Sequence, residues 1–139
     1  MFFPRTPAEE IAHAVHSGVK HSIRNAMSDG NTLYLYGHPI FDQLGLHKEL
    51  NQFSITLAGV NRRTARRYIN AVLSGTDWSV FNKANKPHLR GPTGRSFEID
   101  PCKVYVFREN EKFQFEMITH FDYCGRTLSQ EEREIVERL

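Results

Sequence analysis

Apolar residues near the start of the chain recur at helical spacing. Residues 6–9 have the sequence Thr-Pro-Ala-Glu, in which the threonine caps backbone N–H groups, the proline suits the first turn and the glutamate completes a capping box. From Ile11 onwards, apolar residues every three or four positions define one stripe that continues to Ala26. This pattern predicts a helix over residues 7–28, with Gly30 as its left-handed cap.

Alternating apolar and polar residues, which are typical of half-buried strands, dominate the middle of the chain. The predicted strands cover residues 32–36, 40–44, 53–57, 78–81, 96–99, 103–108 and 113–119. Asparagine, proline, glycine and basic residues are frequent in residues 82–95, where we expect a long loop. The last two strands are expected to form a hairpin.

Two further helices are predicted, one inside the β-rich part of the chain and one at its C-terminal end. The first covers residues 62–73 and the second residues 128–139, where Ser129 and Glu132 form a capping box. A chain of 139 residues fits a single domain, with a β-rich core at about residues 31–121. The fold class we expect is α+β: a mixed, mainly antiparallel sheet, packed by the central helix and flanked by the N- and C-terminal helices.

Composition excludes several classes of protein. The chain has no window of roughly 18 consecutive apolar residues, so we expect no membrane partner. The N-terminus has no long apolar stretch before Glu9, which argues against a signal peptide. Cys102 and Cys124 are too few for a disulfide scaffold, so we expect two reduced, half-buried thiols in a cytoplasmic protein.

Charge is unevenly distributed along the chain, although the formal net charge is only +2. Residues 60–95 contain eight basic residues and a single acid, Asp77. The basic residues are Arg62, Arg63, Arg66, Arg67, Lys83, Lys86, Arg90 and Arg95. Residues 131–139 contain four glutamates and two arginines, so a basic middle is followed by an acidic tail.

The four arginines of the predicted central helix are the strongest candidate for a binding site. Arg62, Arg66 and Asn70 would line one helix face, with Arg63 and Arg67 beside them. The buried side would be formed by Ala65, Tyr68, Ile69 and Val72. Guanidinium groups this close repel one another, and their planar forks match phosphate oxygens well. Three interpretations stay open: a solvated face neutralised by the acidic C-terminal helix, a site for nucleic acid or another phosphate-bearing ligand, and a site for an acidic protein partner.

Residues 51–73 also permit a second structural interpretation. Residues 59–64, followed by residues 66–69, are similar to the turn and recognition helix of a helix-turn-helix DNA-binding motif. The preceding residues 53–57 are rich in β-branched side chains, and Ile55 stands where close helix packing usually needs a small residue. A strand followed by a helix is therefore favoured over a helix-turn-helix.

Two more features could extend a phosphate site. The loop at residues 88–95 could turn backbone N–H groups toward an anion, with Arg90 and Arg95 at its rim, although a plain surface loop is the simpler expectation. Tyr34 and Tyr36 share one face of their strand and are the best candidates for exposed aromatic side chains. The leucines on the other face of that strand are expected to be buried.

No complete catalytic or metal-binding motif is present in the sequence. His13 and His16 are three positions apart on the first predicted helix, but nothing supplies a third ligand at a recognisable spacing. His120, Asp122 and Cys124 alternate along a predicted strand, where alternate residues are about 6.5 Å apart and cannot form a productive catalytic line. We therefore expect binding rather than catalysis, with no metal ligand and no cofactor.

Three short patterns occur between residues 31 and 81. Residues 32–37 contain a Leu-Tyr-Leu-Tyr-Gly strand, residues 54–59 are Ser-Ile-Thr-Leu-Ala-Gly, and residues 64–73 form a threonine-arginine helix that ends in asparagine and aliphatic residues. Together they resemble a group of small, uncharacterised bacteriophage-encoded accessory proteins. That group has no established activity, so the resemblance implies a viral accessory protein in a bacterial cytoplasm and transfers no catalytic residue.

The resemblance and the charge pattern together predict a phage-type accessory protein that binds nucleic acid or a phosphorylated ligand. The arginines of the central helix would contact phosphates, and Lys83, Lys86, Arg90 and Arg95 would extend the basic surface. The alternative is a viral inhibitor that docks on a host defence protein. Small size, the viral resemblance and the charge asymmetry favour this alternative, which would need exposed aromatic anchors.

Overall fold

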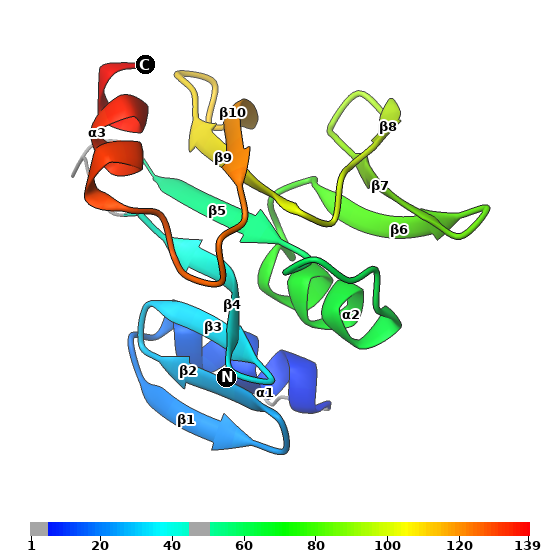
Figure 1. The fold of residues 1–139 in the computed structure, drawn as a ribbon, viewed down its shortest axis with the longest axis vertical. Coiled ribbons are helices and arrows are strands. Elements are labelled where there is room, and N and C mark those ends of the chain that lie inside the picture. Colours follow the sequence, from blue (N-terminus) through cyan, green and yellow to red (C-terminus); the bar gives the residue numbers. More distant parts are fainter. Residues whose placement is uncertain (1–5, 45–50) are drawn as a thin grey trace.

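The computed structural model describes residues 6–44 and 51–139, which form three helices and ten strands (Figure 1). In chain order the elements are α1 (Pro7–His16), β1 (Lys20–Ile23), β2 (Ala26–Asp29), β3 (Thr32–Leu35), β4 (His38–Gln43), β5 (Gln52–Thr56), α2 (Arg63–Val72), β6 (Ser79–Lys83), β7 (Lys86–Arg90), β8 (Ser96–Glu98), β9 (Lys103–Glu109), β10 (Phe115–Asp122) and α3 (Gln130–Arg138). The segment between β5 and β9 carries α2 and three short strands, and it returns the chain to the edge of β5.

The strands form two antiparallel sheets. A seven-stranded sheet has the order β1-β2-β3-β4-β5-β9-β10, and a three-stranded sheet has the order β6-β7-β8. The predicted α+β class is confirmed, with one central helix and one helix toward each end of the chain. The strands differ from the prediction in being divided between two sheets, and every pair in the described residues is antiparallel. Tight turns between sequential strands reverse the chain direction and so produce antiparallel pairs.

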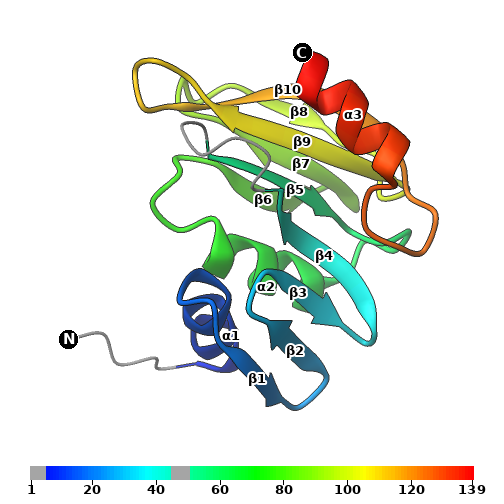
Figure 2. The same cartoon turned by 90° about the vertical axis from the view of Figure 1, so that its left-hand side faces the viewer.

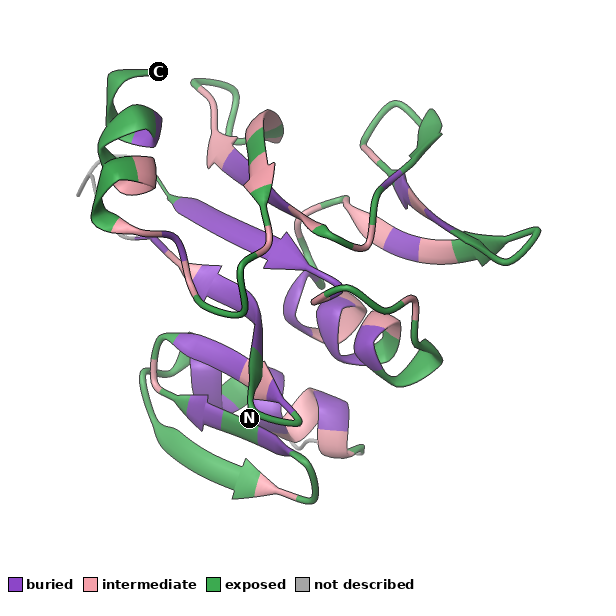
Figure 3. Ribbon diagram, viewed as in Figure 1, coloured by how far each residue is buried: buried purple, intermediate pink, exposed green. Residues whose placement is uncertain are grey.

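The helices lie on opposite faces of the seven-stranded sheet, with α1 and α2 on one face and α3 on the other (Figure 2). Alternate residues of β9 show this arrangement. Tyr105 and Phe107 join the core that contains α1 and α2, whereas Val104 and Val106 pack with Val136 of α3. β5 is covered on both faces, so all five of its residues are buried (Figure 3).

The first helix is shorter than the apolar spacing predicts. It begins as expected, because the Thr6 hydroxyl accepts a hydrogen bond of 3.2 Å from the N–H of Glu9. It ends at His16, and Gly18 follows with a left-handed φ of 69°. The N–H groups of Gly18 and Val19 donate to the carbonyls of Val15 and Ala14 in the last helical turn. Residues 20–29 then form the β1–β2 hairpin. The predicted helix over residues 17–28 is therefore wrong.

The prediction of a long loop at residues 82–95 is also wrong. Ala84 and Asn85 both have left-handed backbones, with φ values of 52° and 62°. This is the geometry of a two-residue turn that joins antiparallel strands, and it allows β7 to pair with β6. The loop that remains, residues 91–95, connects β7 to β8.

Residues 52–72 form a strand followed by a helix, so the helix-turn-helix interpretation is wrong. β5 pairs with β4 along one edge and with β9 along the other. Both edges of its backbone are therefore committed to the sheet and cannot form a helix. α2 covers residues 63–72, close to the predicted helix.

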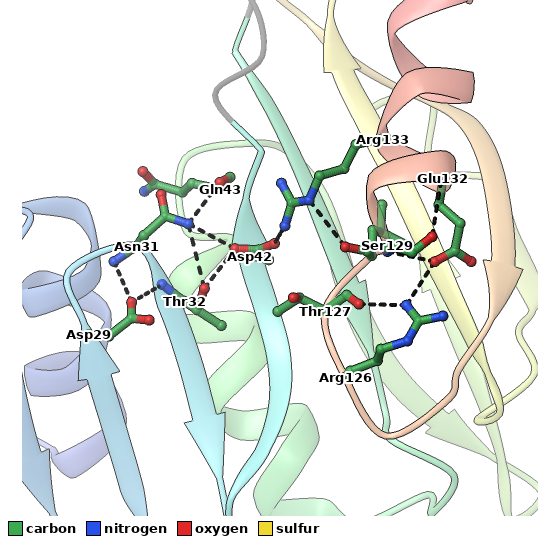
Figure 4. Close-up of polar contacts among 11 residues, drawn as sticks. Asp29, Asn31, Thr32, Asp42, Gln43, Arg126, Thr127, Ser129, Glu132 and Arg133 are labelled. Atoms are coloured by element: carbon green, nitrogen blue, oxygen red, sulfur yellow. Dashed lines mark hydrogen bonds and ion pairs between the residues drawn. The ribbon is translucent and has the colours of Figure 1, made fainter.

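The C-terminal helix begins with the predicted capping box. The Ser129 hydroxyl accepts from the Glu132 N–H at 3.2 Å, and the Glu132 carboxylate accepts from the Ser129 N–H at 2.8 Å. One turn into the helix, the Arg133 guanidinium lies 2.8 Å from the carboxylate of Asp42 on β4 (Figure 4). Together with the burial of Val136, this ion pair attaches α3 to the sheet.

None of the helices in the described ranges is both long and apolar enough to pass through a membrane. The thiols of Cys102 and Cys124 are free, and both residues are exposed rather than half-buried as the sequence analysis predicts. Both lie at the ends of β9 and β10, outside the two hydrophobic clusters.

Candidate phosphate-binding site

Four arginines surround the start of α2 and form the α2 arginine cluster: Arg62, Arg63, Arg66 and Arg67. The opposite side of the helix is buried, as predicted, through Ala65, Tyr68, Ile69 and Val72. This burial fixes the rotation of the helix, so that Arg62, Arg63 and Arg67 are exposed and Arg66 is half-buried. The cluster is therefore presented at the surface.

No carboxylate among the described residues lies within ion-pair distance of the cluster. The glutamates of α3 are on the opposite face of the seven-stranded sheet, where Glu132 pairs with Arg126 at 3.0 Å and Glu134 with Arg138 at 3.9 Å. The interpretation in which the acidic C-terminal helix neutralises these arginines is therefore wrong. None of the four arginines therefore forms an ion pair with a carboxylate of the described residues.

The N-terminus of α2 adds positive charge at the same place. α1 and α3 each have a capping side chain and two acids in the first turn, which suit the partial positive charge of a helix N-terminus. α2 has neither: its N-cap residue, Arg62, makes no capping hydrogen bond and its first turn contains no acid. The arginines therefore stand where electrostatics favour an anion.

Neighbouring side chains orient two of the four arginines. Arg62 stacks over the ring of Tyr36, with its guanidinium carbon 5.2 Å from the ring centroid. Tyr36 occupies the β3–β4 turn, where its φ of 51° and that of Gly37, 79°, form a tight two-residue turn. Arg66 donates a hydrogen bond to the side-chain oxygen of Asn61. Two guanidinium groups are therefore held in place before any ligand arrives.

The β6–β7 turn brings Lys83 and Lys86 next to the cluster. Asn61, which accepts from Arg66, donates to the side chain of Asn82 at 2.9 Å and so connects the start of α2 to this turn. Lys83 is exposed, and Lys86 is 3.8 Å from Glu98 in a solvent-exposed pair of the kind that contributes little. Both lysines therefore extend the basic surface.

Arg90 and Arg95 lie at the other end of the small sheet. Arg90 is four residues along β7 from Lys86, or about 13 Å away, and its guanidinium stacks over the ring of Phe81. In the loop that follows, the N–H of Gly91 donates to the Arg95 carbonyl and the N–H of Gly94 donates to the Gly91 carbonyl. The N–H groups of Gly91 and Gly94 are therefore hydrogen-bonded within the loop and do not point toward an anion, contrary to the prediction.

Asn70 and Tyr34 are placed by the fold in surroundings unlike those of the arginines. The Asn70 amide donates to the Val80 carbonyl at 2.8 Å and accepts from the Val80 N–H at 2.7 Å, so it links α2 to β6. Burial, followed by the nearby Asp29 carboxylate, raises the pKa of Tyr34. An acidic neighbour is unfavourable for a phosphate contact. The expected burial of the strand's two leucines is confirmed.

A cavity of about 300 Å³ adjoins the cluster and contains residues that the sequence analysis missed. Its lining is Thr6, Pro7, Ala8, Arg24, Asn25, Leu35, Tyr36, Thr64, Arg67 and Tyr68. Arg24 belongs to the β1–β2 turn, inside the segment predicted as helix. The sequence predicts Tyr68 only as a buried residue of the central helix and not as part of a site. No local sequence signal brings these two residues together, because only the packing of α1 and α2 on the sheet does so.

The described residues form neither a complete metal site around His13 and His16 nor a complete catalytic site around His120, Asp122 and Cys124. Within residues 6–44 and 51–139 there is no group of three histidine, cysteine or acidic side chains that could hold a metal ion. Asp122 pairs with Lys103, and His120 packs against the ring of Tyr105. His16 bonds the carbonyl of Val72 at 2.8 Å, which is a structural contact between α1 and α2.

Comparisons with protein-family models, with curated proteins and with solved structures found no match for this chain. Any function must therefore be inferred from the charge and geometry of the site itself.

Proposed function

We propose that the protein binds nucleic acid or another phosphorylated ligand through the α2 arginine cluster, as a phage-type accessory protein of the bacterial cytoplasm. One observation carries this proposal. Four guanidinium groups within six positions have no carboxylate at ion-pair distance in the described residues, at a helix N-terminus that itself favours anions.

The chemistry of the cluster favours phosphate over other anions. An arginine presents parallel N–H groups that match two phosphate oxygens, and several arginines together match a repeating phosphate backbone. Lys83 and Lys86 add point charges beside the cluster. Contacts of this kind do not depend on base sequence, and they release condensed counterions from the nucleic acid. Binding should therefore be independent of sequence and sensitive to salt.

Replacing Arg62 and Arg63 together by glutamine should weaken binding and flatten its salt dependence. Each lost phosphate contact lowers the slope of log affinity against log salt by about one, so the double variant should lose roughly two. Fluorescence anisotropy with labelled DNA or RNA of mixed sequence, over about 50–200 mM salt, measures this slope. Arg138→Gln, at the exposed C-terminal end of α3, removes a charge elsewhere and serves as the control. Salt-independent binding by the parent protein would reject the proposal.

Arg63→Glu should stabilise the fold while it weakens binding. An acid at the first position of α2 relieves repulsion within the cluster and suits the helix N-terminus, so the free energy of unfolding should rise by about 0.5–1 kcal/mol. Urea denaturation and the anisotropy titration on the same preparation measure the two effects. A loss of both stability and binding would show that the arginine is there for folding, and the case for a ligand would weaken.

Docking on a host defence protein is a second candidate function, favoured by the exposed aromatic side chains. Phe113 is 83% exposed at the tip of the β9–β10 hairpin, and Phe97 of β8 is also exposed. Exposed aromatics of this kind anchor protein interfaces. A host protein that copurifies after nuclease treatment, and is lost with Phe113→Ser, would support this function if labelled DNA and RNA do not bind.

A further inference from the structure

The cavity of about 300 Å³ beside the cluster lies where four elements meet. Residues from the start of α1, the β1–β2 turn, the β3–β4 turn and α2 all line it. The two turns are held by the sheet and the two helices pack on each other, with the His16 side chain bonded to the α2 carbonyl of Val72. The cavity is therefore a surface pocket whose walls are positioned by packed helices and by the turns of the sheet.

The lining carries two positive charges and no negative one among the described residues. Arg24 comes from the β1–β2 turn and Arg67 from α2. Of the two acids in the first turn of α1, Glu10 pairs with His21 at 3.2 Å, and Glu9 lines a neighbouring groove that Arg67 also lines. A small anion that enters would meet two guanidinium groups, with hydroxyl and amide groups from Thr64 and Asn25 nearby.

Tyr68 contributes a polar group that the fold leaves without a partner. Its residue is only 5% exposed, it lines the cavity, and its hydroxyl has no hydrogen-bond partner in the described part of the chain. Burial raises the pKa of this hydroxyl, and the nearby Arg24 and Arg67 guanidinium groups oppose that rise. The hydroxyl is therefore protonated at neutral pH and can donate a hydrogen bond. The hydroxyl can therefore donate to an acceptor that enters the cavity.

Tyr36 gives the cavity an aromatic wall. It lines this cavity and also a smaller one of about 60 Å³, which Arg62 shares. Arg62 stacks over the Tyr36 ring and lines the smaller cavity, and Tyr36 is 50% exposed, so part of its side chain is accessible to a ligand. Purine and pyrimidine bases stack on aromatic rings without regard to sequence.

We propose that this cavity binds a single nucleotide with a terminal phosphate, either a free nucleoside 5′-monophosphate or the 5′-phosphorylated end of a strand. Arg24 and Arg67 hold the phosphate, the Tyr68 hydroxyl donates to one of its oxygens, and the Tyr36 ring stacks on the base. This inference rests on the proposed function, because Arg67 belongs to both sites. The volume is at the lower limit for ligand sites and admits one nucleotide but no duplex.

Isothermal titration calorimetry with each of the four ribonucleoside 5′-monophosphates tests the inference, with the four nucleosides as controls. Dinucleotides with and without a 5′-phosphate form the second arm. Binding of the monophosphates and not of the nucleosides would support a free nucleotide as the ligand. Binding confined to the 5′-phosphorylated dinucleotides would support a strand end. Absence of phosphate-dependent binding in both arms would overturn the inference.

Two single substitutions identify the site. Tyr68→Phe removes only the hydroxyl and should weaken phosphate-dependent binding roughly tenfold. Arg24→Asn should weaken it by at least as much, and asparagine tolerates the left-handed backbone of this position, where φ is 53°. Thermal unfolding of each variant verifies that it is folded, and Arg138→Gln is the charge control. Unchanged binding in both folded variants would also overturn the inference. Salt-sensitive binding of long strands without a 5′-phosphate would then leave the proposed function standing alone.

Discussion

Replacing Phe107 by alanine should lower the free energy of unfolding by about 3–5 kcal/mol, the largest effect we expect from any single substitution in the core. Phe107 is fully buried on β9. Its ring stacks on Phe53 of β5 at 5.0 Å between centroids, and the edge of Trp78 meets it at 4.9 Å. Truncation removes these contacts and leaves a cavity, because the surrounding strands cannot collapse into the space.

This substitution also tests how the two sheets are joined. Trp78 directly precedes β6, and its indole N–H donates to the Phe115 carbonyl of β10 at 2.8 Å. Phe107→Ala should therefore loosen the three-stranded sheet first, with faster hydrogen exchange in β6 and β7 than in β3. Urea denaturation gives the stability, and Phe113→Ala, at a position 83% exposed, should leave it unchanged. Equal losses of stability at both positions would contradict the packing of Phe107 between Phe53 and Trp78.

Replacing Asp42 by asparagine should cost about 3 kcal/mol of stability, because it leaves buried donors without their charged acceptor. The Asp42 carboxylate is buried on β4 and accepts from three side chains (Figure 4). These are the Thr32 hydroxyl at 2.7 Å, the Asn31 amide at 2.8 Å and the Arg133 guanidinium at 2.8 Å. Asparagine has almost the same shape, so no cavity forms and the loss measures electrostatics and hydrogen bonding alone.

The control for this prediction is Asp77→Asn. Asp77 is exposed and has a left-handed φ of 68°, which asparagine also tolerates, so its replacement should be nearly neutral. Chemical denaturation of both variants gives the comparison. Asp42 lies on the side of the sheet that α3 covers, so a folded Asp42→Asn protein should bind nucleic acid as the parent does. A parallel loss of binding would mean that the ligand surface extends to α3.

Local signals predicted several features of the fold because each depends on residues close together in the chain. The capping pairs at the start of α1 and α3 involve residues three positions apart, and the buried stripe of α2 repeats every turn. The end of α1 was also encoded locally, in Ser17 and Gly18. The apolar spacing nevertheless favoured a longer helix, since Val19, Ile23 and Ala26 fit both a helix and a hairpin.

The sequence by itself determined which residues carry the positive charge and that four of them stand together at the start of one helix. Tertiary structure alone decided whether that charge is compensated, because it placed the glutamates of α3 across the sheet. It also bonded Asn70 to Val80, paired the N–H groups of Gly91 and Gly94 within their own loop, and brought Arg24 beside Arg67 and Tyr68. The physical reason is that charge pairing and cavity shape depend on distances between segments remote in the chain, which no local pattern specifies.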